Sequence, residues 1–329
     1  MADRATDYPI VDIHTHLFRT VEIGKQALYG LRPDRERPKY VGLPNEHLKT
    51  MKAAGVSYCG ALAVTPTREM RERALAERGP YGKPRWAESS GLALDSKLLA
   101  RMDHNNSWAC ALGQEHPELV PFIMVDPRLL SGFQLASYVQ NRVQEGARGV
   151  KLLAIQTQHH GDDERLFAMY EYMQDAGIPL FAQSGAGGVP SPVTGDIWGR
   201  PMRFAKVLET FPRLDVVLAH ALGGYNGSMG DTLYLADHFE RVYFDTTVVQ
   251  DRVYEAPDVL GPQMAELIRR VGPEHVVFGD NFPLFDYDRR RDIDVILGLP
   301  ITDSEKRTIL SDNGMRILHR SGDFAVGEA

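Results

Sequence analysis

The sequence predicts a (β/α)8 TIM barrel, and three features of the chain carry that prediction. Eight short apolar runs rich in Val, Ile and Phe recur along the 329 residues. Between them, segments such as 163–177 and 202–211 place apolar residues three or four apart with charges on the opposite face, as amphipathic helices do. Eight strand–helix units in a chain of this length fit a closed barrel better than an open, doubly wound sheet.

The predicted strands follow one another without a linker, an internal repeat or a low-complexity tract, so we expect one domain over residues 1–329. The runs lie near residues 10–13, 57–64, 119–125, 149–153, 178–182, 214–219, 242–245 and 275–278. Residues 66–95, after the second run, mix arginine, glutamate, glycine and proline without a clean period. We expect this insertion at the functional end of the barrel, as part of a lid or of a subunit contact in a homo-oligomer.

The composition argues against several classes of protein. Hydrophobic residues make up 43% of the chain and charged residues 25%, which are the proportions of a folded globular protein. The formal net charge of -7 provides no overall positive field that would gather nucleic acid. No signal segment opens the sequence, and no apolar run approaches the ~18 residues of a membrane span. With Cys59 and Cys110 each alone in an apolar stretch, we expect a cytoplasmic protein with reduced thiols and no membrane partner.

The strongest local signal is the segment V-D-I-H-T-H at residues 11–16, at the end of the first predicted strand. The two-residue period of a strand predicts that Asp12, His14 and His16 share one face. Two neutral imidazoles one strand repeat apart can chelate a divalent ion at a barrel mouth, so His14 and His16 are candidate metal ligands. A single histidine on a strand would more often be a packed core residue.

Three further polar side chains end predicted strands. His220 follows V-V-L-A and precedes a glycine-containing loop, which favours a role as an acid, a base or an oxyanion donor. Lys151 ends the fourth strand, where a buried ammonium needs a carboxylate from either a substrate or the protein. Asp245 ends the seventh strand, where either a ligand contact or capping of the next segment suits it.

Several longer motifs are spread over nearly the whole chain. After V-D-I-H-T-H come H-P-E-L-V-P-F-I-M-V-D-P at 116–127, G-V-K-L-L at 149–153, I-P-L-F-A-Q-S-G at 178–185, F-P-R-L-D-V-V-L-A-H at 211–220, V-Y-F-D-T-T at 242–247, F-G-D-N-F-P at 278–283 and I-L-S-D-N-G-M-R-I-L at 309–318. Each motif alone is a weak signal. Together they resemble the amidohydrolase-related branch of the amidohydrolase superfamily, whose members are TIM barrels.

The resemblance implies a mononuclear site for a divalent metal, with Zn as the expected ion, and a small-molecule substrate. His14 and His16 match the H-x-H of the first strand, and His220 matches a sixth-strand histidine that contacts the bound water or the substrate. Two ligand positions depart from the family, because Gln183 stands at the fifth-strand histidine and Asn281 at the eighth-strand aspartate. A neutral amide is a weaker metal donor, so we expect the metal to be weakly bound or absent, with both amides orienting the substrate.

The departure at Asn281 also removes a general base. An amide cannot accept the proton of a nucleophilic water, as the family's aspartate does in hydrolytic members. Asp280 is adjacent, but the strand period turns its side chain to the other face unless a bulge or the strand end re-aims it. Asp280 is therefore either a catalytic base or a residue that faces outward or caps the next helix. One arginine of the run 289–291 can also reach the mouth.

The leading hypothesis is a hydrolase that acts on a small lactone, ester or amide. In this hypothesis His14 and His16 either hold a weakly bound metal or contact the substrate directly, and His220 exchanges protons. The carbonyl or carboxylate is oriented by Lys151, Gln183 and Asn281. The first alternative is a lyase, chiefly a non-oxidative decarboxylase of an aromatic or enoic acid, because relatives also run that reaction and it needs no hydrolytic water. The second alternative is a barrel that has lost catalysis and binds a ligand or a partner protein.

Overall fold

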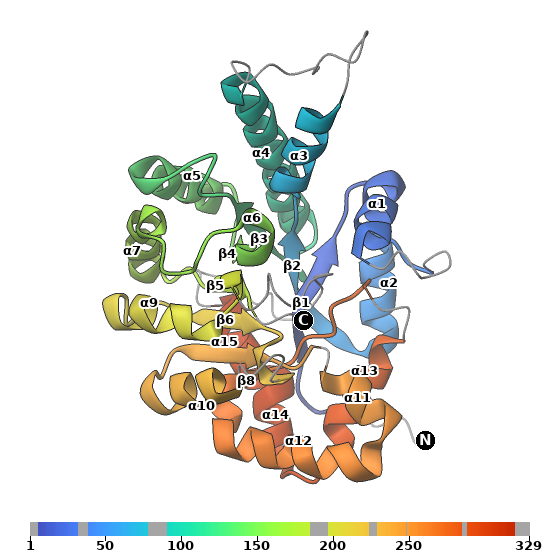
Figure 1. Ribbon diagram of the computed structural model, residues 1–329. Helices are drawn as coiled ribbons and strands as arrows, with labels where there is room; N and C mark the ends of the chain where they lie inside the picture. Colours follow the sequence, from blue (N-terminus) through green and yellow to red (C-terminus); the bar gives the residue numbers. More distant parts are fainter. Residues whose placement is uncertain are drawn as a thin grey trace.

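The computed structural model describes residues 6–31, 39–77, 91–184, 197–223, 229–247, 249–284 and 288–319. Within these residues, one parallel sheet holds eight strands in the order of the chain, which confirms the predicted TIM barrel (Figure 1). The strands are β1 (Ile10–Leu17), β2 (Val56–Ala63), β3 (Leu119–Val125), β4 (Gly149–Leu152), β5 (Leu180–Gln183), β6 (Val216–Ala219), β7 (Val242–Asp245) and β8 (Val276–Val277).

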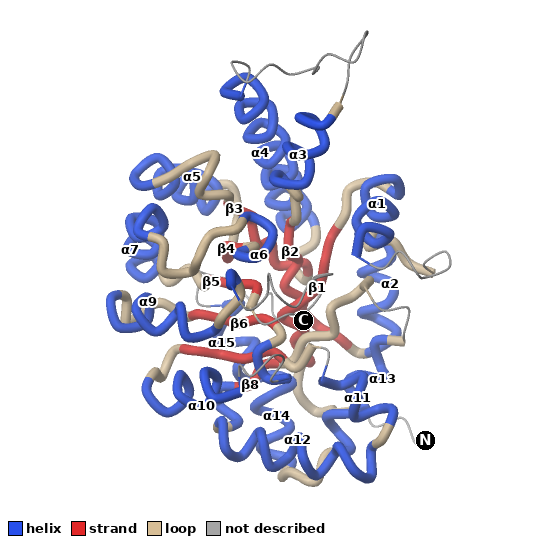
Figure 2. The backbone as a smooth tube through the Cα atoms, viewed as in Figure 1, coloured by secondary structure: helices blue, strands red, loops and turns tan. Residues whose placement is uncertain are grey.

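Helices surround the strands, as Figure 2 shows in blue around red. The α-helices are α1 (Val21–Leu31), α2 (Pro44–Ala54), α3 (Thr67–Ala76), α4 (Gly91–Glu115), α5 (Gly132–Gln144), α6 (Ala154–Thr157), α7 (Phe167–Ala176), α9 (Ala205–Thr210), α10 (Met229–His238), α11 (Val249–Glu255), α12 (Pro257–Val271), α13 (Arg289–Gly298), α14 (Asp303–Arg307) and α15 (Asn313–His319). Local sequence sets several of their ends: the Asp288 side chain accepts from the backbone N–H of Arg290 and caps α13, and Gly177 ends α7 at φ 68°.

The barrel closes between β8 and β1 through the segment that follows the short strand β8. The backbone N–H of Ile13 donates to the Phe278 carbonyl at 2.9 Å, and that of His16 donates to the Phe282 carbonyl at 2.7 Å. In return, the backbone N–H of Asn281 donates to the His14 carbonyl at 2.9 Å. The F-G-D-N-F-P segment is therefore held in direct register with V-D-I-H-T-H.

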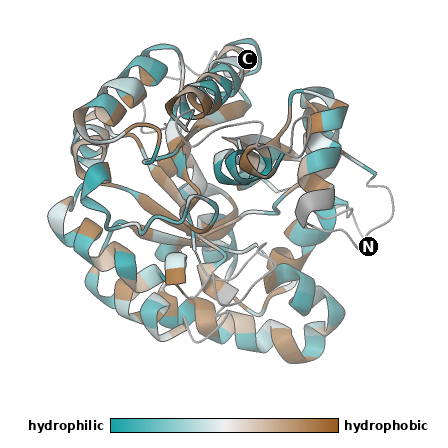
Figure 3. Cartoon of the chain, turned by 45° about the horizontal axis from the view of Figure 1, so that its top comes forward, coloured by the Kyte–Doolittle hydropathy of each residue, from teal (hydrophilic) through white to brown (hydrophobic). Residues whose placement is uncertain are grey.

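Apolar side chains fill two layers on either side of the barrel wall. An inner cluster inside the barrel contains Val11, Ile13, Phe122, Phe181 and Tyr243, among others. A larger outer cluster lies between the strands and the helices, whose surfaces carry both hydrophobic and hydrophilic residues in Figure 3. In the part of the chain that the structure describes, no helix combines the length and apolar character that crossing a bilayer requires.

The predicted insertion at 66–95 is helical at both ends, although its sequence shows no clean helical period. Helix α3 follows β2, and α4 begins at Gly91; the two extend together from the barrel in Figure 1. Asp95 pairs with Arg71 at 3.0 Å and with Arg128 at 2.7 Å. These charged contacts replace an apolar stripe, which is why the period is hard to see in the sequence. Residues 78–90 lie outside the described residues, and the role of the insertion stays a prediction.

Candidate active site

Three imidazoles from two strands converge inside the mouth of the barrel. The ring centroid of His14 lies 5.1 Å from that of His16 and 5.1 Å from that of His220. On its other side the His14 ring contacts Phe181 of β5 at a centroid distance of 4.8 Å. The structure thus brings together the histidines that the sequence analysis named on β1 and β6.

Asp245, at the end of β7, holds this cluster in place. Its Oδ2 accepts from His14 Nδ1 at 2.6 Å, and its Oδ1 accepts from the backbone N–H of His220 at 2.7 Å and from the Thr247 hydroxyl at 2.6 Å. Because both oxygens are engaged and the side chain is fully buried, the contacts favour a positioning role for Asp245. The sequence analysis had left open a ligand contact or capping of the next segment. The bond to Nδ1 leaves His14 Nε2 buried and without a partner among the described residues.

His220 lies just beyond β6 in a left-handed backbone conformation, with φ 65°. Both of its ring nitrogens are buried and have no hydrogen-bond partner in the described part of the chain. Burial lowers the pKa of His220 to about 3, and the nearby His14 and Lys151 act in the same direction, while Asp245 raises it. The ring is therefore neutral at neutral pH, and a bound anion would raise its pKa.

Lys151, in β4, lies next to the same cluster. Its side chain is 1% exposed, and Nζ lies 4.0 Å from the centroid of the Phe181 ring. No described carboxylate lies within ion-pair distance of Nζ, so the structural Asp partner that the sequence left open is not found. Burial lowers the pKa of Lys151 to about 7, and Asp245 partly opposes that shift.

The two amides at the expected ligand positions also face buried space. Gln183 is 5% exposed and Asn281 is 3% exposed, and the side-chain oxygens Oε1 and Oδ1 have no described partner. Asn281 adopts φ 61°, so its backbone turns sharply just after β8. It lies close enough to His16 to raise the pKa of that imidazole, which burial otherwise holds well below its usual value. Both amides are thus placed where a ligand can meet them.

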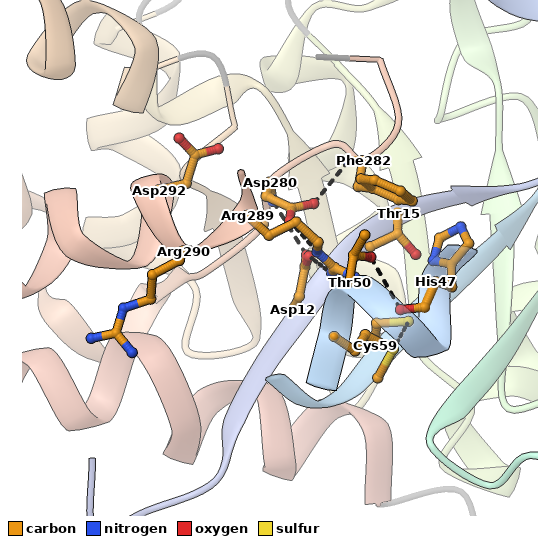
Figure 4. Close-up of polar contacts among 12 residues, drawn as sticks. Asp12, Thr15, His47, Thr50, Cys59, Asp280, Phe282, Arg289, Arg290 and Asp292 are labelled. Carbon is orange, nitrogen blue, oxygen red and sulfur yellow. Dashed lines mark hydrogen bonds and ion pairs between the residues drawn. The ribbon is translucent and has the colours of Figure 1, made fainter. Parts of the chain in front are cut away.

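Asp280 lies on the opposite side of the wall, in an ion cluster with Arg289 and Asp12 (Figure 4). Its Oδ2 accepts from Arg289 Nε at 2.6 Å, and its Oδ1 accepts from the backbone N–H of Phe282 at 2.8 Å. A carboxylate held in this way is not available as a base at the mouth, so the catalytic role considered for Asp280 is corrected to a structural one. Arg289 is likewise buried in this ion cluster.

Asp12 does not share a face with His14 and His16, contrary to the prediction from the strand period. Asp12 pairs with Cys59 of β2 whereas Thr15 pairs with Ala61, so β1 contains one residue more than its partner between these points. Such a bulge changes which side chains face inward. Ile13 belongs to the inner cluster, His14 reaches the mouth, and Asp12 points to the outside of the barrel.

His47 of α2 is a positioning residue that the sequence analysis missed. Its Nε2 donates to the backbone carbonyl of His16 at 3.0 Å, and its ring packs edge-on against Phe282 at 4.8 Å. A lone histidine in a helix carries no spacing signal, and only the packing of α2 against β1 reveals the contact. His47 therefore supports the backbone on both sides of the junction between β1 and the segment after β8.

These residues do not fit a tightly held divalent metal. The described residues contain no group of three or more His, Cys, Asp or Glu side chains arranged to hold an ion. The donors present are neutral imidazoles and amides, the carboxylate of Asp245 is engaged, and the buried Lys151 would repel a cation whenever it is protonated. The expectation of a weak or absent metal remains a prediction.

The structure resembles known decarboxylases. It matches 5-carboxyvanillate decarboxylase from Sphingomonas paucimobilis with a TM-score of 0.63 and 15% identity, covering 95% of this chain and 99% of that one. It matches 2,6-dihydroxybenzoate decarboxylase from Rhizobium with a TM-score of 0.60 and 13% identity, covering 94% of this chain and 98% of that one. The match to 5-carboxyvanillate decarboxylase from Novosphingobium aromaticivorans, complexed with manganese, has a TM-score of 0.58 and 11% identity, covering 95% of this chain and 96% of that one. At these identities the likeness shows the fold alone.

The family follows from the sequence. A comparison with curated proteins finds no match to this chain. The sequence model of the family described as amidohydrolase, in contrast, matches residues 11–320 and thus all eight strands. This protein therefore belongs to the amidohydrolase family.

Proposed function

We propose that this protein is a lyase that removes CO2 from a small carboxylic acid, aromatic or enoic, without a resident metal. The observation that carries the proposal is the set of groups at the mouth. The buried amine of Lys151 lies with the unpartnered nitrogens of His14 and His220, and no described carboxylate at the mouth is free to activate water. Such a site can bind a carboxylate and deliver a proton. The decarboxylases among its structural neighbours support the same reaction.

The chemistry requires few groups. Lys151 supplies positive charge, and the amide NH2 groups of Gln183 and Asn281 can donate hydrogen bonds to the substrate carboxylate. The substrate carbon takes a proton, which His220 supplies once the bound anion has raised its pKa. The electrons of the bond to the carboxylate then return to the carbon skeleton, and CO2 leaves. No water is consumed.

Hydrolysis of a lactone, ester or amide is the second candidate, and the pair of Asp245 and His14 favours it. A carboxylate bonded to Nδ1 fixes the tautomer that leaves Nε2 as a proton acceptor, the arrangement by which an imidazole can activate a nucleophile. Burial holds the pKa of His14 well below its usual value, however, so the base is weak.

The test is a panel of acids and esters incubated with EDTA-treated protein in D2O. The panel contains 2,6-dihydroxybenzoate, 5-carboxyvanillate, enoic acids and a set of lactones and esters. We expect CO2 release with one deuterium at the vacated carbon, detected by NMR and mass spectrometry. Uptake of 18O from labelled water into an acid product, with no CO2, would establish the hydrolase instead; ligand binding without turnover of any compound would favour a barrel that has lost catalysis.

A further inference from the structure

Lys151 is unusual among the buried groups of the mouth because no described opposite charge neutralises it. Its charge interacts with four groups on the surrounding elements: His14 and His16 of β1, His220 after β6 and Asp245 of β7. Of these, Asp245 is the carboxylate, and both its oxygens are bonded to other groups. An ammonium buried in this way carries a large desolvation cost, whereas the neutral amine does not.

The immediate surroundings are those of a nucleophile. Nζ lies against the face of Phe181, and Phe122 packs edge-on against Phe181 at 6.2 Å, so the floor around the amine is apolar. A lysine becomes nucleophilic when it is desolvated in such a place or set beside other basic groups. Burial holds the pKa of Lys151 at about 7. The neutral amine, which is the nucleophilic form, is therefore more populated at neutral pH than in a lysine with an ordinary pKa.

We propose that Lys151 attacks the ketone of a 3-oxo acid and forms a Schiff base, through which this protein releases CO2. The inference rests on the proposed release of CO2 and differs from it in two respects. The substrate is a small acid with a carbonyl two bonds from the carboxylate, in place of an aromatic or enoic acid, and Lys151 reacts as the neutral amine, in place of supplying positive charge. An unpaired buried amine on an apolar floor, facing neutral imidazoles, is the arrangement that carries it.

The step balances without any further reactant. Nζ bonds to the carbonyl carbon, the carbonyl oxygen leaves as water after taking two protons, and a protonated imine remains. The bond between the carboxylate and its carbon breaks, CO2 departs, and the bonding electrons move to the imine nitrogen to give an enamine. The enamine carbon takes a proton, and one water then releases the ketone and restores the amine. His14 Nε2 and the ring nitrogens of His220 are the buried unpartnered groups that can move these protons.

The first experiment traps the intermediate on the parent protein. The enzyme is incubated with acetoacetate, sodium borohydride is added, and the intact mass and peptide masses are measured. We expect one stable adduct with the mass of an isopropyl group, on Lys151. Lysines at the surface, such as Lys206, which is 52% exposed, serve as internal controls and should remain unmodified. An adduct spread over surface lysines, or none on Lys151, overturns the proposal without depending on a variant.

The second experiment uses variants and separates this inference from the proposed function. Lys151→Arg keeps a positive charge and removes the nucleophile, so acetoacetate decarboxylation should fall at least ~10³-fold, whereas Lys206→Arg should match the parent. If Lys151→Arg still releases CO2 from acetoacetate at the parent's rate, the Schiff base is wrong and decarboxylation stands. If Lys151 forms the adduct but CO2 is not released above the uncatalysed rate, the nucleophile stands and the proposed decarboxylation fails.

Discussion

Strand β1 separates two buried polar clusters that differ in how their groups are paired. On the outer side, Asp12 and Asp280 share the guanidinium of Arg289 and accept backbone N–H groups as well. On the inner side, His14, His220 and the two amides keep nitrogens and oxygens without partners in the described residues. The outer cluster has nearly exhausted its bonding capacity within the described protein, with Arg289 Nη1 as the exception, whereas the inner cluster keeps several buried groups without a partner there.

The two clusters are mechanically linked although their roles differ. Asp280 bonds to the Phe282 backbone and so holds the segment that turns at Asn281. Phe282 in turn packs beneath Arg289 and His47. We infer that the outer cluster holds the geometry in which Asn281 faces the mouth. Buried charge alone therefore does not distinguish the mouth from the outer cluster, whereas the unpartnered imidazole and amide groups do.

Removing Arg289 should give the largest effect, because it leaves two buried carboxylates without a counter-charge. Arg289→Met should lower the free energy of unfolding by about 3–5 kcal/mol, measured by urea or thermal denaturation. Arg290→Met is the matched control: Arg290 pairs with Asp294 at 2.9 Å nearer the surface, and its loss should cost about 1 kcal/mol or less. A parent-like melting temperature for Arg289→Met would show that the outer cluster is not structural.

Removing His220 should act on turnover and leave folding nearly unchanged. His220→Asn should reduce the rate with the substrate identified from the panel by ~10²- to 10⁴-fold, because a proton carrier is lost. The melting temperature should stay close to that of the parent, since the ring nitrogens make no bonds within the described protein. A large drop in melting temperature with the activity per folded molecule preserved would assign His220 to the core.

Replacing the two amides by the ligands that the family resemblance implies should convert the inner cluster into a metal site. We expect Gln183→His combined with Asn281→Asp to raise the affinity for Mn²⁺ or Zn²⁺ by at least ~10-fold over the parent, in which any metal is substoichiometric and removed by EDTA. Isothermal titration and elemental analysis measure the change, and adding His14→Ala should abolish it. One tightly held ion per parent chain would refute the premise, and an unchanged affinity in the double variant would refute the assignment of the two positions.

Lowering the pH should reduce the free energy of unfolding, because His220 is neutral in the folded protein. This is the smallest of the expected effects. The folded pKa of His220, about 3, lies below its unfolded value near 6.5, so its contribution to stability is present above pH 6.5 and is lost as the pH falls toward 3. Between pH 7 and 5.5 the contribution should fall by about 1 kcal/mol. Asp292, whose pKa burial raises to about 7, acts in the opposite direction in the parent and the variant alike.

The difference between the parent and His220→Asn isolates this contribution. Urea denaturation at both pH values should show the parent losing stability relative to the variant by that amount. Equal pH dependence in the two proteins would mean that His220 is charged in the folded state, contrary to its burial.

The sequence by itself determined the barrel and most of the polar groups at its mouth. Apolar runs alternating with amphipathic segments specify strands and covering helices because burial follows those periods. The positions of His14, His16, Lys151 and His220 follow from counting to the ends of strands, where a barrel gathers its functional residues. Gln183 and Asn281 were named only because the sequence resembles the amidohydrolase family. The sequence analysis did not predict the charged helix α3, because its contacts are ionic and leave no apolar period.

Only the tertiary structure decided which of these groups keep hydrogen-bonding atoms without a partner. A bulge in β1 turned Asp12 outward, and the contacts of Arg289, 277 residues away from Asp12 in the chain, withdrew Asp280 from the mouth. Asp245 became a positioning residue because His14 and His220 lie within reach of it. Hydrogen bonds between distant segments depend on register and packing, which no local pattern encodes, so the satisfied and the unsatisfied buried groups could be told apart only once the chain was folded.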